Sequence, residues 1–169
     1  MRKFISPHHI QVLLALIAGL ILGPASPCRA DGAVRLSQGQ LLYVPVYSHI
    51  YAGDKTKGNE FYLAATLSLR NIDQKKSITV TQADYYDSQG KLIRKHLDKT
   101  ATIAPFSAME FIVKESDIEG GSGAKFVIRW QSDEMTSPPL VEAVMIGAKM
   151  QQGISFTSRA IVLEESEGR

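Results

Sequence analysis

The sequence predicts an all-β fold, a single immunoglobulin-like β-sandwich of about eight strands, with a β-barrel as the alternative. Three observations support this prediction. Apolar and polar residues alternate with period two in many short segments, turn-forming residues separate the segments, and no convincing amphipathic helix follows residue 30. Several short strands around one hydrophobic core are typical of a sandwich.

The first predicted strand, residues 41–51, has two different faces. Its aliphatic residues lie at even positions, from Leu42 to Ile50, and we expect them to enter the core. The opposite face is aromatic and contains Tyr43, Tyr47, His49 and Tyr51. Pro45 has no backbone N–H to donate, which favours a strand at the edge of its sheet.

Seven further strands are predicted in order, at residues 61–71, 77–87, 91–97, 107–115, 124–130, 140–148 and 153–163. In 77–87, Ile78 and Val80 are out of phase with Ala83 and Tyr85, so we expect a β-bulge near Thr81 or Gln82. A type I turn at 87–90 (DSQG) would join this strand to the next as a hairpin. Residues 140–148 are apolar on both faces and predict a central strand, whereas 153–163 alternates between apolar and polar.

The first thirty residues predict a removed signal peptide, with the mature domain at 31–169 and its core at about 36–163, before an acidic tail. Arg2 and Lys3 precede an uncharged apolar run at 10–23, and a segment of small residues and prolines follows. As a helix this run would span about 21 Å, shorter than the roughly 30 Å of a bilayer core. We therefore expect a periplasmic or secreted protein without a membrane span in its mature chain. The alternatives are an anchor formed by the uncleaved signal or by lipidated Cys28.

Removal of the signal peptide changes the charge and cysteine content. The full chain has 19 Lys+Arg and 17 Asp+Glu, but Arg2, Lys3 and Arg29 lie before residue 31, so the mature chain has 16 basic and 17 acidic residues. A net charge of −1 gives no indication of a nucleic-acid partner. Cys28 is the only cysteine, so the mature domain would contain no disulfide, thiol nucleophile or cysteine-ligated metal.

Metal and catalytic motifs are weak, and we expect no metal, no cofactor and no assembled catalytic set. The mature chain keeps only His49 and His96, whereas catalytic zinc needs three protein ligands. The acidic loop 115–121 does not have the spacing of an EF-hand, and GGSG at 120–123 favours a flexible turn over a nucleophile elbow. A hydrolase or lyase using His49 as general base, with Asp54 as its partner, is the alternative hypothesis.

The sequence resembles one known family. The segments LYVPVYSHIYAGD, FYLAATLSLRN, ITVTQADYYDSQGKLIRK, GGSGAKFVIRW and VEAVMIGAKMQQGISFTSR are similar to exported bacterial proteins of the family called domain of unknown function 3124. The similarity covers about residues 36–162, and its matching positions are Tyr43, Pro45, Tyr47, His49, Tyr51, Gly153, Ser155, Phe156, Thr157 and Arg159. The resemblance implies an exported single domain and brings no activity, cofactor or catalytic residue.

These observations favour a non-enzymatic module that binds a protein or saccharide partner in the cell envelope. The candidate binding residues are Tyr43, Tyr47, His49 and Tyr51, on the aromatic face of the first predicted strand. Aromatic side chains offer large contact areas with polar tips, which suits both kinds of partner. The same pattern also fits rings that pack beneath a neighbouring loop, since tyrosine is a favoured strand residue.

Overall fold

The computed structural model describes residues 35–51, 53–54 and 58–166, which belong to one compact unit. The predicted signal peptide at 1–30, including Cys28, lies outside the described residues. Regular structure in the described part of the chain consists of twelve β-strands. No helix long and apolar enough to cross a membrane occurs in these residues.

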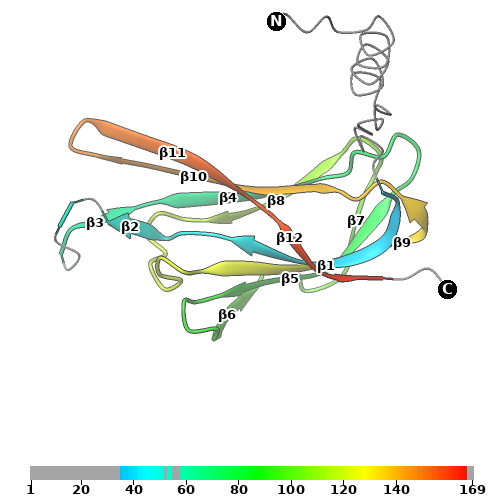
Figure 1. Cartoon of the computed structure of the whole chain (residues 1–169), viewed down its shortest axis with the longest axis horizontal. Helices are drawn as coiled ribbons and strands as arrows, with labels where there is room; N and C mark the ends of the chain where they lie inside the picture. The colour runs from blue at the N-terminus through cyan, green and yellow to red at the C-terminus, as the bar shows by residue number, and fades with distance from the viewer. Residues whose placement is uncertain (1–34, 52, 55–57, 167–169) are drawn as a thin grey trace, which may run out of the picture. The chain divides into compact units, whose positions relative to one another are not determined.

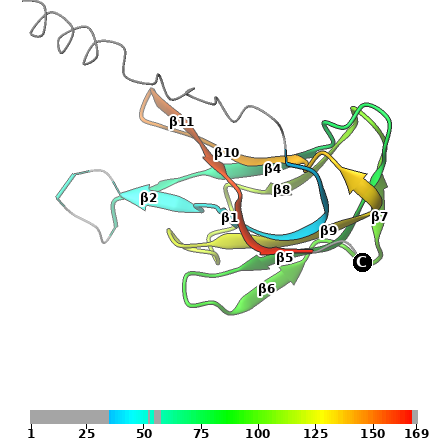
Figure 2. The same cartoon turned by 45° about the vertical axis from the view of Figure 1, so that its right-hand side comes forward.

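The strands form two main antiparallel sheets and one two-stranded ribbon (Figures 1 and 2). The first sheet has the order β12 (Ile161–Glu165), β1 (Ser37–Pro45), β9 (Lys125–Thr136), β5 (Ile78–Tyr86) and β6 (Leu92–Lys95), and β7 (Ala101–Ile103) also pairs with β5. The second sheet has the order β11 (Gln152–Arg159), β10 (Leu140–Lys149), β4 (Ala64–Arg70) and β8 (Ala108–Val113). The ribbon pairs β2 (His49–Tyr51) with β3 (Glu60–Tyr62). No sheet of the described residues closes into a barrel, so the predicted all-β sandwich is confirmed.

The hydrophobic core lies between the two main sheets and follows the predicted alternation. Leu42 and Val44 on β1 and Trp130 on β9 face Leu67 on β4 and Met145 on β10, and all are buried. Burial of large apolar side chains is the main favourable contribution to the stability of such a fold.

The bulge and the turn predicted in the β5–β6 hairpin are both present. The register of β5 against β9 shifts between Val80 and Gln82, which brings Ala83 and Tyr85 into the core. The turn is closed by a hydrogen bond from the Gly90 N–H to the Asp87 carbonyl (3.1 Å). The Asp87 carboxylate also accepts the N–H of Lys91 (2.8 Å).

Twelve strands replace the predicted eight because three predicted strands are each divided in two, and β7 has no counterpart in the prediction. The first division falls after Val46, where the backbone turns away from its neighbouring strands. Ser48 donates its N–H to the Gly121 carbonyl (3.1 Å), and its own carbonyl accepts the N–H of Leu63 (3.0 Å). These bonds to Gly121 and Leu63 hold the chain between the end of β1 and the start of β2.

The prediction that Pro45 marks an edge strand is wrong. Strand β1 lies between β12 and β9, inside the first sheet. Proline is tolerated because it is the last residue of β1, and the pairing with β12 ends two residues earlier, at Tyr43. The position therefore lacks the ladder bond that a proline would break.

The last predicted strand, 153–163, divides because the chain changes sheets near Ala160. Strand β11 pairs with β10, whereas β12 pairs with β1, so the two strands extend opposite sheets along one side of the sandwich (Figure 1). Ile154 and Val162, which share the apolar face of the predicted strand, are 37% and 46% exposed. An edge strand that leaves one sheet for the other has few neighbours to cover its apolar residues.

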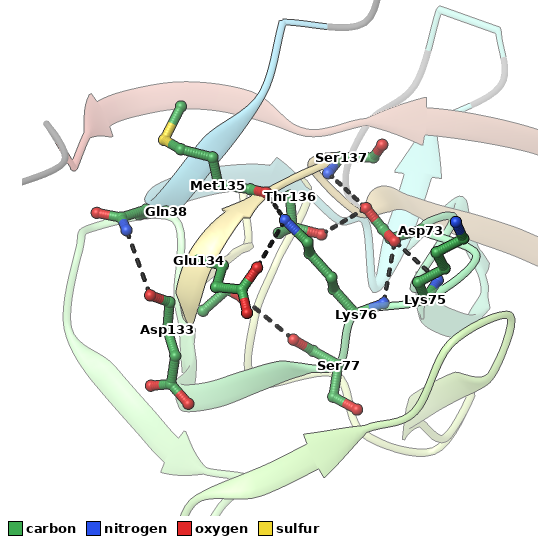
Figure 3. Close-up of polar contacts among 11 residues, drawn as sticks. Gln38, Asp73, Lys75, Lys76, Ser77, Asp133, Glu134, Met135, Thr136 and Ser137 are labelled. Carbon is green, nitrogen blue, oxygen red and sulfur yellow. Dashed lines mark hydrogen bonds and ion pairs between the residues drawn. The ribbon is translucent and has the colours of Figure 1, made fainter.

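Asp73 joins the two connections that cross between the sheets, β4–β5 and β9–β10 (Figure 3). Its carboxylate accepts the N–H groups of Lys75 (2.9 Å), Lys76 (3.0 Å) and Ser137 (3.1 Å) and the hydroxyl of Thr136 (2.8 Å). The backbone N–H of Lys75, followed by the other donors, holds the pKa of Asp73 well below its usual range. Asp73 therefore has a structural role, and its hydrogen-bonding capacity is used within the fold.

Candidate functional site

The β2–β3 ribbon lies at the same end of the sandwich as the turn between β10 and β11 (Figures 1 and 2). In its register His49 is opposite Tyr62, and Tyr51 is opposite Glu60. Residues opposite each other in an antiparallel pair share a face, as do residues two apart in one strand. The rings of His49, Tyr51 and Tyr62 accordingly form one cluster, with centroids 5.2 Å apart for His49 and Tyr51 and 6.2 Å apart for His49 and Tyr62.

Both ring nitrogens of His49 have hydrogen-bond partners. The Ser48 hydroxyl donates to the Gly121 carbonyl (3.2 Å) and lies 3.2 Å from His49 Nδ1. Since that hydroxyl proton goes to the carbonyl, the consistent assignment places a proton on Nδ1 and makes Nε2 an acceptor for the Tyr51 hydroxyl (3.1 Å). The imidazole is thereby fixed in one orientation beside the two tyrosines.

Ser48 and His49 have the side-chain types of a nucleophile and its base, but their surroundings do not favour catalysis. Ser48 is fully buried, so a substrate cannot reach its hydroxyl. Asp54, the other residue of the catalytic hypothesis, is exposed in the loop after β2, whereas the hydrogen-bond partners of His49 are Ser48 and Tyr51. A general base and a nucleophile must converge on an open space near the substrate.

The four residues predicted as a binding face separate into three places. His49 and Tyr51 stay together on the ribbon. Tyr47 packs edge-on against Phe156 of β11, with ring centroids 5.5 Å apart, and so joins the partly buried margin of the core. Tyr43 is opposite Val127 on β9 and lies on the outer face of the first sheet, because its neighbours Leu42 and Val44 point into the core.

Tyr62 of the aromatic cluster borders a shallow depression, and a second one lies next to it over strands of the second sheet. One, of about 640 Å³, is lined by Tyr62, Glu115, Ser116 and Ile118, and the other, of about 450 Å³, includes Glu115, Ile146 and Ile154. Glu115 borders both. We define the Tyr62 surface as His49, Tyr51, Tyr62, Glu115, Ile118 and Ile146.

The Tyr62 surface is open and mainly apolar. Tyr51 and Tyr62 are 43% and 40% exposed, and Ile118 and Ile146 are 52% and 58% exposed. Its position depends on Gly147 in β10, because a Cβ on that glycine would lie 2.3 Å from the Tyr62 carbonyl oxygen. The close approach of β10 to the end of β3 thus requires a residue without a side chain.

Sequence reasoning identifies His49 and Tyr51 but misses Tyr62, Ile118 and Ile146. Alternation places Tyr62 on the polar face of the predicted strand 61–71. In the structure, its side chain is likewise exposed. The missing information is the register of the ribbon, which places Tyr62 opposite His49. An aromatic residue on an otherwise polar strand face, as at Tyr62, is the signal that could have indicated an exposed contact surface.

The glycine-rich loop and the acidic loop have structural contacts. Gly121 accepts both the N–H and the hydroxyl of Ser48, and the Gly120 carbonyl accepts the N–H and the hydroxyl of Ser88 (2.9 and 3.0 Å). Within residues 35–51, 53–54 and 58–166, no three His, Asp or Glu side chains are grouped closely enough to hold a metal ion.

Comparisons with known proteins give one family and one distant structural neighbour. The family model described as "Protein of unknown function (DUF3124)" matches residues 39–163. The curated proteins include no significant match. A solved structure described as "Crystal Structure of Thermotoga maritima 1070" is similar at 11% sequence identity and a TM-score of 0.42, over 77% of this chain and 97% of that chain. Because the family model covers well over half of the chain, from β1 to β12, the protein belongs to the DUF3124 family.

Proposed function

We propose that this protein is a non-enzymatic exported β-sandwich module that binds a partner protein in the cell envelope through the Tyr62 surface. The observation that carries the proposal is a single exposed surface on which aromatic rings and isoleucines are grouped. Contiguous exposed apolar patches on soluble domains often mark interaction sites, and tyrosine is enriched among residues that dominate binding energy. The apolar run near the amino terminus supports export.

A protein partner suits this surface better than a saccharide does. Exposed isoleucines such as Ile118 and Ile146 gain by burial against apolar side chains, whereas a saccharide presents mostly hydroxyl groups. The two tyrosine hydroxyls and the imidazole favour a saccharide as the second candidate, because rings with polar tips can both stack and hydrogen-bond. In either case the partner would cover a shallow surface and not enter a deep pocket.

The test is affinity capture from a cell-envelope extract with the purified mature protein. The double variant Tyr51→Ala/Tyr62→Ala should retain at least about tenfold less partner than the wild type, since aromatic contacts at such sites contribute about 2 kcal/mol or more. Tyr43→Ala is the matched control, because Tyr43 lies on the other sheet. Circular dichroism would verify that all three proteins fold.

Two outcomes would overturn the proposal. If Tyr43→Ala lost the partner and the double variant retained it, the binding surface would lie on the first sheet and not at the Tyr62 surface. If the protein specifically retained purified envelope saccharides and captured no protein, a saccharide would be the partner instead. The catalytic alternative has its own test: hydrolase and lyase screens of wild type and His49→Ala should give equal rates, and a loss of activity in His49→Ala would establish a catalytic role.

A further inference from the structure

Three buried side-chain atoms in the described residues have no hydrogen-bond partner, and their residues form one cluster. The atoms are Tyr85 Oη, His96 Nε2 and Asp117 Oδ1. The rings of Tyr85 and His96 have centroids 6.3 Å apart, and the charge of Asp117 acts on both. A buried polar atom without a hydrogen-bond partner costs about 1–3 kcal/mol, so this cluster is a costly place in the fold.

His96 is enclosed by aromatic rings. The centroids of Phe111 on β8 and Phe126 on β9 lie 5.5 and 5.1 Å from the imidazole centroid, and Tyr85 on β5 adds a third ring. The backbone N–H of His96 donates to the Ala83 carbonyl (2.8 Å), which fixes the residue beside β5. A proton added to this half-buried imidazole would place a positive charge among aromatic rings and near the positive charge of Arg94.

The loop 114–121 contacts this cluster at Tyr85 and is tied to the neighbouring strand β6. Its Asp117 forms an ion pair with Arg94 of β6, with 3.0 Å between the guanidinium nitrogen and the carboxylate oxygen. Gly120 packs directly on the Tyr85 hydroxyl, because a Cβ at position 120 would lie 2.0 Å from Tyr85 Oη. Tyr85 is fully buried beneath this contact.

The same loop forms one wall of the Tyr62 surface. Glu115, Ser116 and Ile118 line the depression next to Tyr62, and Asp117 lies between them in the sequence. The cluster of Tyr85, His96 and Asp117 and the Tyr62 surface therefore share the same short segment. A shift of Tyr85, whose ring lies beside His96, would change how the loop packs and thereby the position of Ile118 against Tyr62.

We infer that the loop 114–121 is a pH-sensitive latch: proton uptake by His96 releases the loop and removes one wall of the Tyr62 surface. The effect on partner binding rests on the proposed function, whereas the opening of the loop does not. Partner binding would then be stronger at neutral pH than at acidic pH.

The charged and titratable groups around His96 favour this direction. Burial lowers the pKa of His96 from its ordinary value of 6.5, and the positive charge of Arg94 lowers it further, while Asp117 and Asp84 act in the opposite direction with smaller effects. Tyr85 stays neutral, because burial first and Asp117 next raise its pKa to about 12. The closed state thus binds a proton more weakly than an open or unfolded state in which His96 meets water. The stability that the closed state gains over the open state by keeping His96 neutral is fully present at neutral pH. It declines as the pH falls below about 6.5.

Hydrogen–deuterium exchange tests the latch without any partner. Between pH 7.5 and pH 5.5, after correction for intrinsic exchange rates, the opening equilibrium of amides 114–121 should increase about fivefold or more in the wild type. Amides in β9 should remain protected and serve as the internal reference. In His96→Gln, which cannot take up the proton, the protection of the loop should be the same at both pH values.

Unchanged loop protection in the wild type, or an equal increase in His96→Gln, would overturn the inference. If His96→Gln fails to fold, NMR titration of the wild type replaces it. The His96 ring protons and the loop amides should then titrate with the same midpoint, below 6.5, and separate midpoints would contradict the latch. A latch that opens as expected in a protein that captures no partner would refute only the proposed binding function.

Discussion

Replacing Trp130 by alanine should lower the free energy of unfolding by about 4 kcal/mol, because it leaves a cavity that the surrounding sheets can only partly fill. Trp130 is fully buried on β9, which lies between β1 and β5 in the first sheet. Its indole N–H also donates to the side-chain oxygen of Gln40 on β1 (3.2 Å). Urea unfolding followed by circular dichroism measures the change.

The control variant Trp130→Phe separates packing from hydrogen bonding. It keeps an aromatic ring in the core but leaves the Gln40 amide oxygen without its donor, so we expect a smaller loss of about 1.5–2 kcal/mol. If the free energy of unfolding fell less in Trp130→Ala than in Trp130→Phe, or by less than about 1.5 kcal/mol, Trp130 would not lie in a closely packed core.

Replacing Gly147 by alanine should lower the free energy of unfolding by about 3 kcal/mol, because the added methyl group has no space. It would lie 2.3 Å from the Tyr62 carbonyl oxygen and 3.0 Å from Leu63 Cδ2 and Phe61 Cε1. The backbone atom cannot move without shifting the end of the ribbon away from β10. We therefore expect both lower stability and an altered position of the Tyr62 ring.

Gly153→Ala is the matched control for this substitution. Gly153 is on the neighbouring strand β11, opposite Ala148 of β10. A Cβ added to Gly153 would be 4.0 Å from its nearest neighbour, the Gly147 carbonyl oxygen. Chemical denaturation of the two variants should give a large loss for Gly147→Ala and a change within about 1 kcal/mol for Gly153→Ala. Equal losses would show that β10 does not approach the ribbon as closely as described.

The core of the sandwich follows directly from short-range sequence patterns. Alternation assigns Leu42, Val44 and Trp130 to the interior, and a break in the same alternation locates the bulge near Thr81. These features are predictable because the side chains of a strand alternate with period two, so any extra residue must show as a phase change. The Asp87 turn can be predicted for a similar reason, since the hydrogen bonds that close it join Asp87 to Gly90 and Lys91.

Features that depend on distant segments are not visible in the sequence. Ser48 ends the first strand through its bond to Gly121, 73 positions away. The chain changes sheets near Ala160 although no proline or glycine marks that point. The residues predicted as an acidic tail begin inside β12, where Glu165 accepts a hydrogen bond from Gln40 (2.9 Å). Each of these outcomes is set by tertiary pairing and not by local propensity.

The candidate site could be predicted only in part for the same reason. His49 and Tyr51 are two apart and share a face by local geometry, so the sequence pairs them correctly. Tyr47 is also at an odd position, but it follows the end of β1, so strand alternation does not determine where its side chain points. Tyr62 joins the cluster because the register of the ribbon places it opposite His49. Ile118 lies beside Tyr62 because of the path of its loop. Neither the register nor the loop path leaves a periodic pattern in the sequence.

Site-specific photo-cross-linking in living cells tests the central claim most directly. A photoreactive residue incorporated at position 62 would sample the Tyr62 surface, and the same residue at position 43 would sample the outer face of the other sheet. The proposed function predicts a discrete covalent adduct with an envelope protein from position 62 and none from position 43. An adduct from position 43 alone, or no adduct from position 62, would contradict it.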